Sequence, residues 1–284
     1  MTQALDLSYI PGTNDSLRSF DLHVPSLHTA RESPMIIFVH GGAWRSEDKS
    51  QYQALARNLA EASNAPVLVP NYRLTPSVPT LETQFLHPGH AEDILHFLDF
   101  ITSGAWPGVP ELKFTPTGRG LYLLGHSAGA HILSSIFLDS SAAFPSLTPP
   151  PAVLKAARGI VMTEGIYDID LLLAKFPNYR QWFIAAVFGD RASYADASTT
   201  GLALREGSPE DLRWLVIHSK GDTLVDQPQS DAIVAHLRTL YGGGAAADAR
   251  VTRNVDQFDM EHNDVLSAPL YIDVIRAFVA EGKE

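Results

Sequence analysis

The fold of this chain is decided by residues 121–131, which read LYLLGHSAGAH. The first part, Leu121–Leu124, is a short apolar run typical of a strand buried on both faces of a parallel sheet. Gly125-His126-Ser127-Ala128-Gly129 follows at once, and Ala128–Leu138 then has the apolar spacing of a helix. A strand that turns so abruptly into a helix holds its serine at a tight elbow, where flanking glycines relieve crowding. The pattern predicts that Ser127 is a nucleophile; the alternative is an ordinary strand-to-helix turn.

Apolar runs and helical patterns alternate on both sides of this stretch. A hairpin of two segments comes first, and six runs suited to buried strands follow: Leu5–Ile10 and Leu17–Val24, then Met35–Val39, Pro66–Val69, Leu121–Leu124, Gly159–Met162, Trp214–Ile217 and Val251–Val255. Helical spacing occupies Tyr52–Ser63, His90–Ser103, Ala128–Leu138, Gln227–Tyr241 and Asp264–Ala280. Such alternation indicates a parallel sheet with right-handed crossovers. We therefore expect an α/β fold with about eight strands, mostly parallel, flanked by helices.

One segment interrupts this alternation. Residues 167–211 follow the sixth predicted strand and are amphipathic and rich in aromatic side chains. We interpret them as a helical insertion, or cap, over the edge of the sheet, whose aromatic residues either pack in the core or wall a substrate pocket. No repeat or linker divides the chain, so residues 1–284 are expected to form a single domain. Residues 104–119 and 146–152 are predicted to be surface loops, and 242–247 a small-residue connector.

A second motif, His40-Gly41-Gly42-Ala43-Trp44, follows the predicted strand Met35–Val39. Acyl transfer places negative charge on a carbonyl oxygen, which backbone N–H groups can stabilise if the main chain approaches closely. In hydrolases with a serine elbow, these donors come from such a loop and from the residue after the serine. We therefore assign an oxyanion hole to Gly42, Ala43 and Ala128, with Gly41 shaping the turn. The alternative is a merely structural glycine turn.

A serine nucleophile needs a base, and the base needs an orienting acid, in the chain order serine, acid, histidine. The strand Trp214–Ile217 is followed by Asp222, with Asp226 four residues further on as the competing acid. We favour Asp222. The strand Val251–Val255 is followed by His262 in the loop before the last helix, the position expected for the base. The alternative for His262 is a surface histidine at a helix start.

The other histidines give weaker signals. His87 and His90 have a spacing seen in metal sites, but few further ligands lie near them, so we expect no metal there. His131 lies on the helix after the elbow, and it either packs behind the site or faces a substrate.

Composition excludes several classes of function. The formal net charge is −11, which argues against nucleic acid as the main partner. The absence of cysteine excludes thiolate nucleophiles, disulfides and Cys-based metal sites. No secretory pattern and no long apolar run are visible. We expect a soluble, cytoplasmic protein that acts on a small molecule without a cofactor, nucleic acid or membrane. Whether it forms a homodimer is left open.

With these motifs placed, the chain resembles the α/β-hydrolase superfamily over nearly its whole length. Within it, the segments 40–44 and 125–131 look like those of the kynurenine formamidases, especially the fungal branch, where Trp44 matches a tryptophan of the loop motif. The segment Thr163-Glu164-Gly165-Ile166-Tyr167-Asp168 and the stretches after Asp222 and His262 are similar as well. The resemblance implies that the nucleophile, acid and base are Ser127, Asp222 and His262.

The resemblance also implies an activity, the hydrolysis of N-formyl-L-kynurenine to L-kynurenine and formate in tryptophan breakdown. Two other functions compete with it. One is a broad carboxylesterase of the same fold, because such esterases share most of these residues. The other is a non-catalytic receptor on a hydrolase fold, although such receptors typically lose a triad member.

Overall fold

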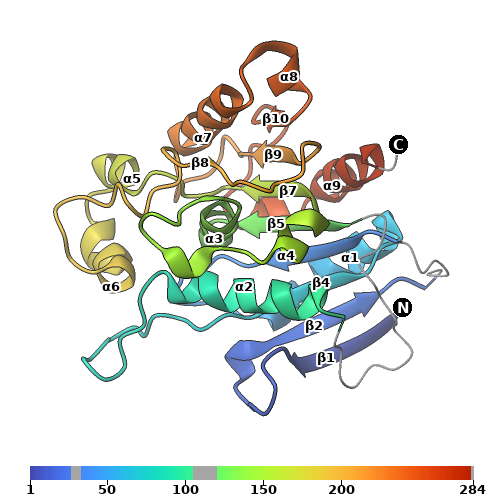
Figure 1. Cartoon of the computed structure of the whole chain (residues 1–284), viewed down its shortest axis with the longest axis horizontal. Helices are drawn as coiled ribbons and strands as arrows, with labels where there is room; N and C mark the ends of the chain where they lie inside the picture. The colour runs from blue at the N-terminus through green and yellow to red at the C-terminus, as the bar shows by residue number, and fades with distance from the viewer. Residues whose placement is uncertain (27–32, 105–119, 283–284) are drawn as a thin grey trace.

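The structure is a computed structural model that describes residues 1–26, 33–104 and 120–282. Its largest feature is an eight-stranded sheet with the order β1-β2-β4-β3-β5-β7-β9-β10 (Figure 1). The strands are β1 (Thr2–Ser8), β2 (Ser19–Val24), β3 (Met35–Val39), β4 (Val67–Pro70), β5 (Leu121–His126), β7 (Ala157–Thr163), β9 (Arg213–Ile217) and β10 (Val251–Asn254). All eight correspond to strands predicted from the apolar runs, with ends displaced by a few residues.

The pairing of the strands confirms a mostly parallel α/β sheet. β2 is antiparallel to both β1 and β4, whereas the pairs from β4 through to β10 are all parallel. The chain passes from β3 to β4 on one side and then returns to place β5 on the other side of β3. Loops that leave neighbouring strands in opposite directions open a crevice at the carboxyl ends of those strands. This is the edge that carries both predicted motifs.

Helices cover both faces of the sheet. Alternate residues of β3 show why: Met35, Ile37 and Val39 join the larger core, and Ile36 and Phe38 join the smaller one. The larger core contains α2 (Gly89–Thr102), α3 (Ala128–Phe137), α4 (Pro151–Ala156) and α7 (Gln227–Leu240). The smaller core contains α1 (Gln53–Ser63) and α9 (Pro269–Glu281), which lie together on the opposite face (Figure 1). Burial on both faces explains the nearly continuous apolar runs.

The segment after β7 contains mostly short helices. These are α5 (Ile169–Lys175), a π-helical turn η4 (Arg180–Ile184) and α6 (Ala185–Phe188). The segment then returns as β8 (Ala203–Leu204), which pairs with β6 (Leu138–Asp139) after α3 in a separate two-stranded sheet. In Figure 1, α5 and α6 lie beyond the end of α3, on one flank of the molecule.

Some local predictions were wrong. The last helical pattern was expected to be continuous from Asp264, but it forms a 3-10 turn, η5 (Asp264–Ser267), and then α9. The break occurs because Ala268 precedes Pro269 and is extended, as residues before proline usually are. Part of the predicted connector 242–247 is helical, as α8 (Gly244–Asp248), because its alanines favour a helix.

Shorter 3-10 turns are η1 (Ser16–Arg18), η2 (Lys49–Tyr52) and η3 (Pro145–Leu147). The last of these overlaps the start of the predicted loop 146–152. The predicted loop 104–119 lies outside the described residues except for Gly104. Among the helices in the described ranges, none has the length and apolar character needed to cross a membrane.

Candidate active site

Ser127 lies at the junction of β5 and α3, in a backbone conformation that residues other than glycine rarely adopt. Its φ is +53° and its ψ is −118°. Its N–H donates to the carbonyl of Thr163 at 2.9 Å, and its carbonyl accepts from the N–H of Ala130 at 3.0 Å. Strained backbone conformations of this kind persist only where the surrounding structure holds them in place, and they are common at functional sites. The elbow predicted from the sequence is therefore present in the structure.

Small residues allow this elbow to exist. A Cβ atom on Gly129 would lie 2.2 Å from the carbonyl oxygen of Val39, at the end of β3. A Cβ atom on Gly125 would lie 2.6 Å from the carbonyl oxygen of Gly129. Both distances are shorter than any real contact of a Cβ atom. The two glycines therefore let β3, β5 and α3 approach one another at the serine.

The loop after β3 runs past the serine with three successive residues in the left-handed region. Gly42, Ala43 and Trp44 have φ values of +84°, +51° and +58°. A Cβ atom on Gly41 would come within 2.9 Å of Cβ of Ser127, which shows how closely the loop approaches. The buried hydroxyl of Tyr72 donates to the carbonyl of Gly41 at 2.7 Å and thereby holds the loop in place.

The backbone amides beside Ser127 point to an anion site. Among the described residues, the N–H groups of Gly42, Ala43 and Ala128 have no hydrogen-bond acceptor. Gly42 and Ala43 also line the same cavity as Ser127, and Ala128 begins α3, where N–H groups lack partners within the helix. Free amides next to a serine can bind an oxygen on which negative charge develops.

Asp222 and His262 are joined by a short hydrogen bond. Nδ1 of His262 donates to Oδ2 of Asp222 at 2.7 Å. The other carboxylate oxygen of Asp222 accepts from the N–H groups of Leu224 and Val225, at 2.8 and 2.9 Å. Burial alone would raise the pKa of Asp222, but the hydrogen bond from His262, the charge of His262 and further hydrogen bonds together outweigh burial and hold that pKa well below its usual value. Asp222 is therefore a fixed anion beside the imidazole.

The competing acid, Asp226, has no contact with His262. It precedes the first turn of α7, and its Oδ1 is buried without a partner. Burial raises the pKa of Asp226. Of the two acids that the sequence left open, only Asp222 therefore meets the histidine.

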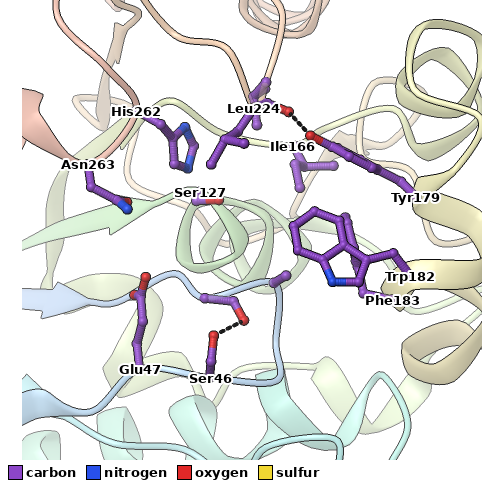
Figure 2. A pocket seen from close by; sticks show the side chains of 13 residues that line it. Ser46, Glu47, Ser127, Ile166, Tyr179, Trp182, Phe183, Leu224, His262 and Asn263 are labelled. Carbon is purple, nitrogen blue, oxygen red and sulfur yellow. Dashed lines mark hydrogen bonds between the residues drawn. The ribbon is translucent and has the colours of Figure 1, made fainter. Parts of the chain in front are cut away.

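His262 faces the serine across a shared cavity. Both residues line it, and Figure 2 shows the imidazole of His262 directed toward Ser127. The main chain of His262 is held by His126, whose Nε2–H donates to the carbonyl of His262 at 3.1 Å. Burial, and then the charge of His262, lower the pKa of His126 to about 3, so His126 is neutral near pH 7.

The cavity has a volume of about 180 Å³ and two chemically different walls. One wall is apolar and largely aromatic, with Ile166, Tyr179, Trp182 and Phe183 contributed by the segment after β7 (Figure 2). The hydroxyl of Tyr179 donates to the carbonyl of Leu224 at 3.0 Å, which ties this wall to the loop of Asp222. The opposite wall carries Ser46, Glu47 and Asn263. The cavity thus suits an aromatic molecule with a polar group.

Several predicted motif residues lie behind the cavity instead of lining it. Trp44 and His131 are completely buried, and their rings meet edge to face at 5.1 Å. Nε2 of His131 donates to the carbonyl of Ala197 at 2.8 Å, which makes His131 a packing residue. His40 is also buried, stacked on Tyr72 with 4.5 Å between ring centroids. These side chains support the glycine loop from within the core.

His87 and His90 are buried in the same region, and His90 shares a hydrogen bond with Oγ1 of Thr75 at 3.0 Å. Over the described ranges, neither belongs to a group of three side chains that could ligate one ion. Such a group does exist at Glu164, His218 and Asp222, whose ligand atoms lie within 4.8 Å of one another. The sequence motifs gave no indication that Glu164, His218 or the cavity residue Glu47 belongs to the site.

The geometry brings together a serine, a histidine and a fixed carboxylate, next to free amides and beneath an aromatic wall. A hydroxyl next to a neutral imidazole that is oriented by a carboxylate can attack an electrophilic carbonyl carbon. The arrangement is therefore chemically suited to acyl transfer.

Comparison with known proteins agrees with this chemistry. A family model described as the alpha/beta hydrolase fold matches residues 36–169. Kynurenine formamidase from Meyerozyma guilliermondii is 26% identical over 74% of each chain, and that from Scheffersomyces stipitis is 25% identical over 72% of this chain and 77% of its own.

Solved structures show the same fold. Esterase B from Lactobacillus rhamnosis superposes with a TM-score of 0.74 and 16% identity, over 99% of this chain and 84% of its own. Carboxyl esterase 2 from Tuber melanosporum has a TM-score of 0.64 and 22% identity, over 93% of this chain and 80% of its own. The chain therefore has the α/β-hydrolase fold, and kynurenine formamidases are among the curated proteins that it resembles over most of its length.

Proposed function

We propose that the protein is a serine hydrolase that cleaves the formamide of N-formyl-L-kynurenine. Ser127 is the nucleophile, His262 the general base and Asp222 the acid that orients it. The observation that carries this proposal is the 2.7 Å hydrogen bond between Asp222 and His262, with His262 and Ser127 in one cavity under an aromatic wall.

The reaction follows from these positions. His262 takes the proton of the Ser127 hydroxyl as its oxygen attacks the formyl carbon, and the resulting oxyanion lies against the amides of Gly42, Ala43 and Ala128. His262 then gives the proton to the departing aryl amine, which breaks the C–N bond and leaves formyl-serine. A water molecule, deprotonated by His262, hydrolyses this ester to release formate and restore the serine.

The two walls of the cavity support an aryl formamide with an amino-acid tail as substrate. We assign the aromatic ring of the substrate to the wall formed by Tyr179, Trp182 and Phe183, where the ring leaves water and packs against these side chains. The α-ammonium group is assigned to Glu47, whose carboxylate accepts a hydrogen bond from the Tyr52 hydroxyl on one oxygen. The names of the relatives support the same substrate.

The test is a comparison of kcat/KM for N-formyl-L-kynurenine, N-acetyl-kynurenine and p-nitrophenyl acetate. We expect the formyl substrate to be preferred and Ser127→Ala to abolish its turnover while the protein stays folded. If kcat/KM for the formamide lies well below that for the ester, the substrate assignment is wrong. Glu47→Gln should raise KM for N-formyl-L-kynurenine about tenfold and leave KM for formanilide, which lacks the amino-acid tail, unchanged.

A broad carboxylesterase is the second candidate, and it is favoured by the esterases among the similar structures and by a 25% identity to Esterase LipQ from Mycobacterium tuberculosis over 91% of this chain and 58% of its own. A high kcat/KM for p-nitrophenyl acetate with negligible formamide cleavage would favour it. A non-catalytic receptor would instead fail to form a covalent adduct at Ser127 with a fluorophosphonate.

A further inference from the structure

Glu164 is a buried acid beside the site that the proposed mechanism does not use. It directly follows β7, is completely buried and has a φ of +50°. Its N–H donates to the carbonyl of Ile217 at 3.0 Å, and its Oε1 accepts from the N–H of Ser219 at 2.7 Å. These bonds fix Glu164 against the strand end that leads to Asp222. A carboxyl group held this firmly in the interior needs a physical explanation.

The neighbour of Glu164 is the carboxyl group of Asp222, and an oxygen of one group lies within 4.8 Å of an oxygen of the other. Two carboxylates this close in a protein interior do not both ionise, so one of them keeps a proton. Asp222 has three donors, namely the imidazole of His262 and the N–H groups of Leu224 and Val225. Glu164 has a single donor on Oε1, and its Oε2 is buried without a hydrogen-bond partner. The donors therefore favour charge on Asp222 and a proton on Glu164.

The other titratable groups around Glu164 do not supply a countercharge. Nδ1 of His218 lies 3.2 Å from Oε2 of Glu164 and also 3.1 Å from Oγ of Ser230, and burial lowers the pKa of His218. Tyr167 and Tyr271 also interact electrostatically with Glu164, and burial keeps both hydroxyls neutral by raising their pKa. The imidazole of His262 binds Asp222, the other member of the pair. The surroundings thus hold Glu164 in its neutral form.

We propose that Glu164 is a protonated carboxylic acid that donates a hydrogen bond from Oε2 to Asp222 and so fixes the orientation of that carboxylate toward His262. Glu164 touches neither the substrate nor the serine, so it is a positioning residue. The inference rests on the proposed function in one respect, the use of Asp222 as the acid of the triad.

The proposal has a consequence at alkaline pH. Burial, and then the hydrogen bond and charge of Asp222, raise the pKa of Glu164 to about 10. Above that pH the pair becomes two adjacent carboxylates with no proton between them, and Asp222 loses one of its donors. The orientation of His262 then weakens. Activity should therefore fall at alkaline pH in the native protein because of Glu164.

Infrared spectroscopy tests the proton directly. The native protein at pH 7 should show the carbonyl stretch of a protonated carboxylic acid, and Glu164→Gln should remove it. This infrared measurement needs no substrate, so it tests the protonation of Glu164 even if the proposed reaction is wrong. Absence of the band in the folded native protein, or its persistence in Glu164→Gln, would overturn the proposal.

Kinetics with N-formyl-L-kynurenine, or with p-nitrophenyl acetate if the formamide is not cleaved, test the role. Glutamine keeps a donor toward Asp222 and an acceptor for Ser219, so Glu164→Gln should keep kcat within about threefold and lose the alkaline decline. Glu164→Ala removes the donor and should lower kcat about tenfold or more with little change in KM.

Equal losses in both variants would contradict a hydrogen-bond donor, provided that circular dichroism shows both to be folded. A shift of the acidic limb of kcat/KM to lower pH in Glu164→Gln would show that the native residue is charged. Activity that is lost on chelation and regained with a divalent cation would indicate a metal ion, in place of a proton, between Glu164 and Asp222. That result would also overturn the proposal.

Discussion

Lowering the pH from 7.5 to 5 should strongly destabilise the fold because the core holds neutral histidines. Four of them are at least nine-tenths buried, with a pKa lowered by burial from 6.5 to about 4 or about 3: His40, His90, His126 and His131. The unfolded chain takes up a proton at each of them below pH 6.5, and the folded protein does not until far lower pH. The stability that depends on their neutrality is therefore present above pH 6.5 and is lost as pH falls below it.

The size of this loss follows from the pKa values. At pH 5 each of the four histidines favours the unfolded chain by about 2 kcal/mol, since one pKa unit is worth about 1.4 kcal/mol. Together they contribute about 8 kcal/mol. His87, whose pKa burial also lowers strongly, acts in the same direction.

Glu164 opposes this trend. Its pKa is raised from 4.5 to about 10, so the folded protein holds one proton more than the unfolded chain between these values. Moving from pH 7.5 to 5 therefore returns about 3 kcal/mol of stability. The net loss is about 5 kcal/mol, a large share of the 5–15 kcal/mol by which folded domains are usually stable. Tm should fall by about 10 °C or more.

The measurement is urea unfolding at pH 7.5, 6.5, 5.5 and 5.0, followed by tryptophan fluorescence and far-ultraviolet circular dichroism. His131→Gln keeps a donor for the carbonyl of Ala197 and should reduce the pH-dependent loss by about 2 kcal/mol. His96→Gln, at an exposed position of α2, is the matched control and should leave the loss unchanged. A free energy of unfolding that stays constant within about 1 kcal/mol across this range would refute the reasoning.

Three further predictions concern the site, and two of them include a control substitution. Asp222→Asn should lower kcat about 10⁴-fold by removing the anion that orients the base, whereas Asp226→Asn should change it less than about threefold; the reverse order would reassign the acid. Gly129→Ala forces a Cβ atom to 2.2 Å from a β3 carbonyl and should cost about 3 kcal/mol or more in urea unfolding, while Gly201→Ala, where the added atom meets nothing within 4 Å, should cost less than about 0.5. Trp182→Ala, at a residue 58% exposed, should raise KM for the aryl formamide about tenfold without lowering Tm; an unchanged KM would remove it from the binding wall.

The sequence predicted the sheet well because strands buried on both faces must be apolar throughout. Met35–Val39 and Trp214–Ile217 differ from the observed strands by at most one residue. Helix ends were harder to place, since they depend on single residues such as Pro269. The pairing of β6 with β8 left no signal in the sequence, because each strand has only two residues.

For the site, the sequence predicts residues that follow the ends of strands, but it does not predict contacts between residues that are distant in the chain. Motif spacing locates Ser127, Asp222 and His262 because each follows the end of a strand. It favoured Asp222 and kept Asp226 as the competing acid, since the turn that separates them is a tertiary feature. Glu164 belongs to a segment singled out for its resemblance, but its role depends on Asp222, which is distant in the chain. Glu47 was missed for the same reason.

His126, the second residue of Gly125-His126-Ser127-Ala128-Gly129, connects the two residues between which we propose that a proton moves, Ser127 and His262. Its backbone precedes the nucleophile, and its ring holds the carbonyl of the base. The elbow that carries Ser127 and the loop that carries His262 are therefore coupled through this hydrogen bond. The distance between the serine hydroxyl and the imidazole therefore depends in part on this one side chain.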